Sequence, residues 1–134
     1  MLTSERMPSI ASNRREEIIK MSNKNIETLV LELNIIVTDI CDSIKNRPDI
    51  TRQLIKSCTS IGANKAEAKY AESKADFIHK MEISLKECSE TMYWLNYLYS
   101  TNNLEEEKYK KAKNVCGIIL KKLISSIRTA KLKR

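Results

Sequence analysis

Residues 51–99 read TRQLIKSCTSIGANKAEAKYAESKADFIHKMEISLKECSETMYWLNYLY, and they combine two amphipathic patterns with a helix-start signal between them. The apolar positions of the first pattern are Leu54, Cys58 and Ile61, and Ile50 just before the stretch extends it. Those of the second recur every three or four residues, at Phe77, Met81, Leu85, Cys88, Met92, Leu95 and Tyr99. Between the patterns lies Ser73, whose hydroxyl can accept a hydrogen bond from the amide three residues on. These features predict helices over residues 49–70 and 74–100.

Two further amphipathic segments flank this stretch, and they predict helices over residues 24–45 and 104–131. The first carries apolar residues at Ile26, Leu29, Leu33, Ile36, Ile40 and Ile44. The second carries them at Tyr109, Ala112, Cys116, Ile119, Leu123, Ile127 and Ala130. Short links favour antiparallel neighbours, so residues 23–134 predict an all-α, up-down-up-down four-helix bundle. Residues 1–22 are polar and weakly patterned, and they predict a flexible N-terminal arm.

Composition supports a single helical domain. The 134 residues include only two glycines and two prolines, which long helices avoid and tight hairpins need. The hydrophobic share is 42% and the charged share 31%, as in a folded globular protein. No apolar run approaches the roughly 20 residues that cross a bilayer, and the start lacks a signal-peptide core. We therefore expect a cytoplasmic protein with no membrane partner.

The residues that usually carry catalysis or bind metals are sparse. Cysteines occur at Cys41, Cys58, Cys88 and Cys116, without a C-x-x-C pair, and His79 is the single histidine. Because each cysteine falls on an apolar stripe, we expect buried structural thiols. Metal sites need tighter ligand spacing, and phosphate-binding loops need more glycine. We expect no metal site, no cofactor, no catalytic residue, no small-molecule substrate and no enzymatic activity.

A stripe of polar residues follows one face of the helix predicted over residues 49–70. Its members are Gln53, Ser57, Ser60, Asn64 and Glu67. Solvent-facing helix surfaces usually collect better helix formers such as lysine and glutamate. One interpretation is a solvent face of weak helix propensity. The interpretation that we favour is a half-buried, hydrogen-bonded seam that sets helix register or contacts another subunit.

These residues also carry a resemblance to a known family. The matching positions are Gln53-Leu54, Ser57, Ser60-Ile61, Ala63-Asn64, Ala66-Glu67, Ser73, Asp76-Phe77, Lys80, Lys86-Glu87, Glu90-Thr91 and Trp94-Leu95. The pattern resembles the bacterial four-helix-bundle proteins encoded in intervening sequences of 23S rRNA genes. It is also similar to the accessory variability determinants of diversity-generating retroelements. The chain departs from the family pattern at Gly62, where proline is common, at Lys65 and at Ala68.

The resemblance implies a left-handed four-helix bundle that assembles as a ring-like homopentamer. It implies no known enzymatic activity. The retroelement members bind a reverse transcriptase and nucleic acid through a basic surface. For this chain the resemblance therefore suggests RNA, DNA or a reverse transcriptase as partners, and a protein–protein scaffold without a nucleic-acid role is the alternative.

The positive charge is concentrated at the C-terminal end. The net charge is +7, and no aspartate or glutamate occurs between Lys108 and Arg134. On a helical projection the basic residues form two clusters on the solvent side of the last predicted helix. The first contains Lys110, Lys121 and Arg128, and the second contains Lys108, Lys111, Lys122 and Lys133. These clusters are candidates for salt-sensitive, backbone-directed nucleic-acid binding. An ordinary solvated lysine face is the alternative.

Several apolar or aromatic side chains lie off the predicted stripes. Val115 and Ile118 fall among the lysines, where exposed apolar residues can mark a subunit contact, although scattered ones are common. Tyr93, Trp94 and Tyr97 flank the stripe of residues 74–100. They suit either the core of a wide bundle or an interface belt, and we favour the interface.

Overall fold

The structure, a computed structural model, describes residues 10–133 and places five helices among them. The helices are α1 (Ile10–Ser22), α2 (Ile26–Ser43), α3 (Pro48–Ala68), α4 (Lys74–Ser100) and α5 (Glu106–Leu132). The described residues contain no strand, so the all-α prediction is confirmed. The expected number of helices is wrong, because part of the predicted arm is helical.

Capping residues explain where the helices begin. Asn25 precedes α2 and accepts a hydrogen bond of 2.8 Å from the Thr28 amide. Ser73 precedes α4, and its hydroxyl oxygen accepts one of 3.0 Å from the Asp76 amide, as predicted. Pro48 occupies the first turn of α3, where its missing N–H costs nothing. The last helix starts two residues later than predicted, after a turn in which Asn102 has a φ of 60°.

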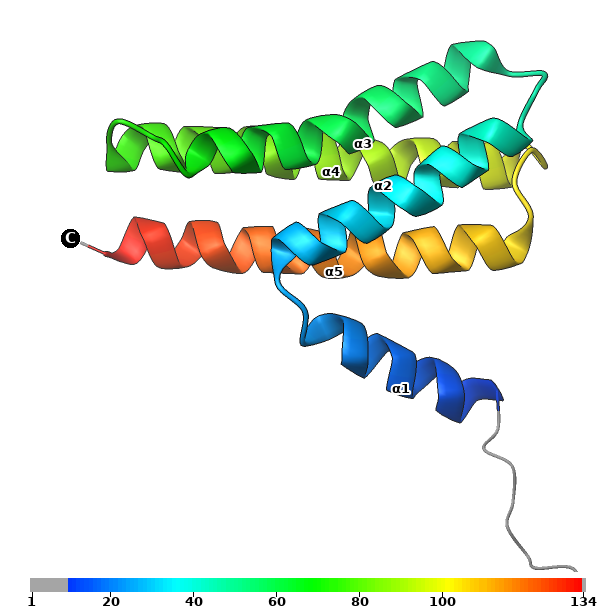
Figure 1. Ribbon diagram of the computed structural model, residues 1–134, viewed down its shortest axis with the longest axis horizontal. Coiled ribbons are helices and arrows are strands. Elements are labelled where there is room, and N and C mark those ends of the chain that lie inside the picture. The colour runs from blue at the N-terminus through cyan, green and yellow to red at the C-terminus, as the bar shows by residue number, and fades with distance from the viewer. Residues whose placement is uncertain (1–9, 134) are drawn as a thin grey trace, which may run out of the picture.

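Helices α2 to α5 pack around one apolar core (Figure 1). Contacts join α2 with α3, α3 with α4, α4 with α5, and α5 with α2, and consecutive helices reverse direction in Figure 1. The largest fully buried side chains come from all four helices: Leu29, Leu33, Val37 and Ile40 from α2, Leu54 and Ile61 from α3, Met81, Leu95 and Leu98 from α4, and Val115, Ile119 and Leu123 from α5. We call α2–α5 the four-helix core.

A glycine permits the close approach of α2 and α3. A methyl group added at Gly62 would lie 2.9 Å from Cγ1 of Val30, closer than carbon atoms pack without displacement. The second glycine, Gly117 in α5, is less constrained, since the same methyl would lie 4.0 Å from Cε of Met92. Only Gly62 therefore keeps two helices close because it lacks a side chain.

Helix α1 lies outside the four-helix core and touches it mainly along α5 (Figure 1). Its attachment includes an ion pair of 3.0 Å between Arg14 and Glu107, and Met21 packs partly against the core. The segment lacks glycine and proline and is rich in arginine, glutamate and lysine, which are good helix formers. Its apolar periodicity is weak, which explains why the sequence pattern did not predict it. Residues 1–9 of the predicted arm lie outside the described residues.

No helix within residues 10–133 has both the length and the apolar character needed to cross a membrane.

Candidate functional site

The outer face of α5 carries the basic side chains singled out from the sequence. Its inner face is fixed by burial of Ala112, Cys116, Ile119, Leu123 and Ile127 in the core. The opposite side leaves Lys111, Lys121 and Arg128 exposed, and Lys108, Lys110 and Lys122 half-buried. Burial of one stripe therefore turns the predicted cations outward.

Ion pairs divide these cations into two groups. Lys108 lies 3.3 Å from Asp39 of α2, and Lys110 lies 3.0 Å from Glu106 one turn earlier. Within the described part of the chain, no carboxylate lies within ion-pair distance of Lys111, Lys121, Lys122 or Arg128. The latter four keep positive charge available for an anionic partner.

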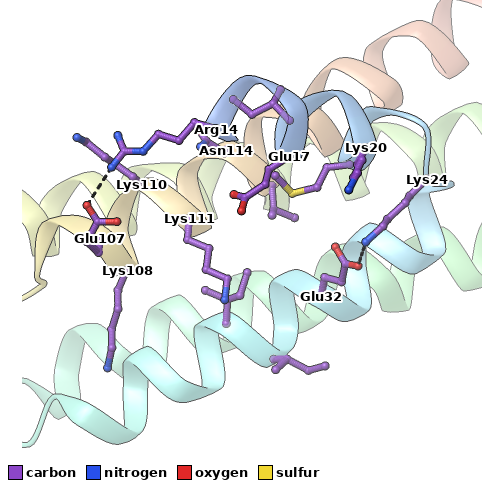
Figure 2. Close-up of a pocket in the computed structure, with 15 residues that line it drawn as sticks. Arg14, Glu17, Lys20, Lys24, Glu32, Glu107, Lys108, Lys110, Lys111 and Asn114 are labelled. Carbon is purple, nitrogen blue, oxygen red and sulfur yellow. Dashed lines mark hydrogen bonds and ion pairs between the residues drawn. The ribbon is translucent and has the colours of Figure 1, made fainter. Parts of the chain in front are cut away.

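The seven predicted cations do not form one patch. Lys108, Lys110 and Lys111 line a groove with α1 and α2, as Figure 2 shows. Of the others, Lys121, Lys122 and Arg128 belong to the second half of α5, and Lys133 directly follows the helix as its C-cap residue. Near the end of that helix, Lys74 donates a hydrogen bond to the Lys133 carbonyl and adds a further cation. Sequence reasoning also missed Arg14 and Lys20 in the groove, because it predicted no helix there, and Lys24, which lies in the link between α1 and α2.

The polar stripe of α3 meets α4 at one buried position. Ser57 is buried and accepts a hydrogen bond of 2.9 Å from the Thr91 hydroxyl of α4. A second buried hydroxyl, Ser84 of α4, donates one of 2.8 Å to the Ile61 carbonyl of α3. These bonds tie α3 to α4 at a fixed register, as the favoured interpretation predicts for Ser57. A subunit contact through the stripe remains a prediction.

The other stripe residues are less buried. Ser60 and Asn64 are half-buried and bond to carbonyls of their own helix, at 2.7 Å and 2.8 Å. Glu67 is exposed and forms an ion pair of 2.9 Å with Lys80 of α4, while Gln53 is exposed. Within the stripe, Ser57 therefore makes the buried bond to another helix, Ser60 and Asn64 bond within α3, and Glu67 reaches α4 at the surface.

The aromatic side chains of α4 form a cluster at the surface. Trp94 and Tyr97 are half-buried against the core, and Tyr93 is 58% exposed. The Trp94 ring lies edge-on to both tyrosines, with centroid distances of 4.9 Å and 6.0 Å. The guanidinium carbon of Arg47 lies 5.5 Å from the centroid of the Tyr97 ring. The same guanidinium group donates a hydrogen bond of 3.2 Å to the Tyr97 hydroxyl. Trp94 and Tyr97 are therefore partly core and partly surface.

The expected exposure of Val115 is wrong. Val115 is only 1% exposed, and Ile118 is half-buried. The reason is that α5 packs against α2 as well as α4, so its buried arc is wider than a single stripe. Val115 is thus a core residue and offers no surface for a subunit contact in this fold.

The thiols behave as structural residues. Cys58, Cys88 and Cys116 are buried and Cys41 is half-buried. Burial raises the pKa of the Cys58 thiol to about 12 and that of Cys41 to about 11. Among the residues described, no cluster of three His, Cys, Asp or Glu side chains is arranged to hold a metal ion, and His79 is exposed. What these residues offer is charge and contact surface.

Comparisons with known proteins agree on one family. Residues 20–125 match the family model described as 23S rRNA-intervening sequence protein. Among solved structures, the chain is similar to a protein of unknown function from the S23 ribosomal protein family of Bacteroides thetaiotaomicron. That likeness has a TM-score of 0.73 and 37% sequence identity, and it covers 78% of this chain and 99% of the other. No curated protein matches the chain.

Proposed function

We propose that this chain, which belongs to the 23S rRNA-intervening sequence protein family, is a non-enzymatic, oligomeric protein. In this proposal the outer face of α5 binds nucleic acid or a nucleic-acid enzyme such as a reverse transcriptase. The observation that carries this proposal is the uncompensated charge of Lys121, Lys122 and Arg128, in a segment without acids. Phosphate backbones bind such surfaces by releasing counterions, so affinity should fall steeply with salt.

The assembly that we propose is a homopentamer built from left-handed, up-down-up-down bundles. A closed ring would repeat the basic face in each subunit and add their potentials at short range. Light scattering should give a mass near five times the 15.4 kDa of one chain. A monomer whose mass does not change with concentration would refute the ring.

Titration of fluorescently labelled RNA and DNA by the purified protein, at low and at moderate salt, tests the basic face. The test variant is Lys121→Glu/Lys122→Glu, and the matched control is Arg52→Glu/Lys56→Glu on exposed positions of α3. Both variants lower the net charge from +7 to +3, because each reverses two cations. Only the position of the charge differs between them.

The proposal requires the α5 variant to lose most of its affinity and the α3 control to lose much less. If two phosphate contacts disappear, the slope of log affinity against log salt should flatten by about two. Equal losses in the two variants would indicate a general charge effect and would contradict a site on α5.

A second candidate function, a protein–protein scaffold, is favoured by a different surface. Leu31 is 66% exposed and Ile35 is 71% exposed, one turn apart on α2. Neighbouring exposed aliphatic residues of this kind often mark protein contacts. Absence of RNA and DNA binding even at low salt would favour the scaffold over the nucleic-acid role.

A further inference from the structure

Two buried thiols face each other where α4 packs on α5. Cys88 and Cys116 are both 0% exposed, and their Sγ atoms lie 3.7 Å apart. Each Sγ atom also lies 3.5 Å from the backbone carbonyl oxygen of the other cysteine. The two residues are therefore direct neighbours across the helix pair, although they are 28 positions apart along the chain.

The distance between the two sulfurs is short enough for a covalent bond to form with little movement. A disulfide has an S–S length of about 2.05 Å, so each sulfur would move by less than about 1 Å. The reciprocal contacts with the two carbonyl groups show that the backbones also approach closely, as disulfide geometry requires.

The other two thiols have different partners. Cys58 donates a hydrogen bond of 3.2 Å to Oδ1 of Asn34, and Cys41 donates one of 3.5 Å to the Thr51 carbonyl. The packing of the folded chain thus favours a single pair of cysteines.

We propose that Cys88 and Cys116 are an oxidation site, at which hydrogen peroxide converts the two thiols into a reversible disulfide that joins α4 to α5. The thiolate of one cysteine attacks a peroxide oxygen, the O–O bond breaks, and the sulfur becomes a sulfenic acid while one water leaves. The second cysteine attacks that sulfur, the S–O bond breaks, and another water leaves as the S–S bond forms. The thiols give up two electrons and two protons, which reduce the peroxide to two molecules of water.

Burial makes this reaction slow without preventing it. The hydrogen bond with Cys88 and burial raise the pKa of the Cys116 thiol, so little thiolate is present at neutral pH. Hydrogen peroxide reaches the pair when α4 and α5 separate locally, and such an opening costs less than unfolding the whole chain. Its small size favours it over a bulkier oxidant such as a peptide disulfide.

The disulfide would close a loop that contains the second half of α4, the following turn and the first half of α5. A cross-link of this kind restricts the unfolded chain and stabilises the folded one, provided that the native geometry is kept. Lys121, Lys122 and Arg128 lie beyond this loop. The inference therefore goes beyond the nucleic-acid role and does not depend on it.

The test treats the reduced, folded protein with hydrogen peroxide and maps its tryptic peptides in the absence of reductant. Trypsin places the two cysteines in separate peptides, residues 87–108 and 114–121. The expected product joins these two peptides, and a thiol reductant should release them. Protein oxidised while unfolded in urea should give a mixture of pairs, because packing no longer selects one.

Two variants identify the residues. Cys88→Ser should abolish the joined product. The matched control, Cys58→Ser, changes a buried thiol outside the pair and should keep it, since a serine hydroxyl can still donate a hydrogen bond to Asn34. In urea unfolding, the oxidised wild type should have a higher midpoint than the reduced protein, and reductant should reverse this shift.

Three results would overturn the proposal. The first is a different pair of joined peptides from the folded protein. The second is free Cys88 and Cys116 thiols after the peroxide has oxidised half-buried Cys41. The third is a midpoint of the oxidised protein that is unchanged or lower. None of these measurements involves RNA or DNA, so failure of the thiol pair and failure of the α5 surface give different results.

Discussion

Replacing Gly62 with alanine should destabilise the protein, although alanine is the better helix former. Removing a glycine from a helix interior gains about 1 kcal/mol from propensity alone. At Gly62 the new methyl would lie 2.9 Å from Cγ1 of Val30, well inside the optimal carbon–carbon separation of about 3.5–4.0 Å. Relieving such overpacking typically costs about 1–3 kcal/mol. The expected net effect is a loss of about 1 kcal/mol.

Gly117 provides the matched control, since it is also a helical glycine. Its new methyl would meet only the flexible end of Met92, at 4.0 Å, which is an ordinary contact. Gly117→Ala should therefore stabilise the fold by about 0.5–1 kcal/mol. Urea unfolding followed by circular dichroism, with all variants at one protein concentration, measures both changes.

A double-mutant cycle identifies the cause of the loss. Val30→Ala removes the methyl that Gly62→Ala would strike, so the double variant should lose about 1 kcal/mol less than the sum of the single losses. If Gly62→Ala stabilises the protein as much as Gly117→Ala does, the close approach of α2 and α3 does not depend on this glycine, and the packing argument is refuted.

Three further predictions concern a cap, an ion pair and the thiols. Ser73→Ala should cost about 1 kcal/mol in urea unfolding, while Ser73→Asp should keep most of the stability, because aspartate also caps. Lys65 donates a hydrogen bond to Glu27 and lowers the pKa of its carboxyl group in the folded protein. The pair therefore stabilises the fold above the pKa that Glu27 has in the unfolded chain, and this stability is lost as the pH falls through the pKa of Glu27 in the folded protein. Lys65→Gln should accordingly destabilise the protein at neutral pH and have a smaller effect in acid, as unfolding at both pH values would show; equal losses would contradict the linkage. At neutral pH the native thiols should react slowly with a thiol reagent, because burial keeps them protonated. Half-buried Cys41, with a pKa of about 11, should be modified before buried Cys58, with a pKa of about 12. Mass mapping of the products gives the order, and modification of Cys58 first would contradict this prediction.

The spacing of apolar residues predicted the helices that bury a regular apolar stripe in the core. The stripe from Leu29 to Ile40 and the cap at Ser73 both have the roles expected of them. Helix α1 could not be predicted in this way, because among its residues 13–22 Met21 is the one that packs partly on the core, while Ile18 and Ile19 are exposed. A weakly amphipathic helix is recognisable only from its surroundings.

The candidate sites were predictable only as far as one helix determines them. The outward direction of Lys121 follows from the core stripe of α5 alone. Burial of Val115 depends on a second neighbour, α2, which no pattern within α5 encodes. Likewise, the stripe containing Ser57 was visible in the sequence, but its partner Thr91 belongs to another helix. The groove needed the position of α1, so it could not be anticipated.

Helix α1 is attached weakly to the four-helix core, so ionic strength should affect both the outer face of α5 and the groove beside α1. The ion pair between Arg14 and Glu107 joins side chains that are 42% and 76% exposed, and such pairs contribute at most about 1 kcal/mol and are screened by salt. Release of α1 would therefore cost far less than unfolding the four-helix core. A rise in salt that weakens the proposed binding of phosphate backbones to α5 would also loosen one wall of the groove. The salt concentration would then affect both surfaces at once. Brief tryptic digestion tests this, because cleavage after Arg14 or Lys20 should become faster as the salt concentration increases.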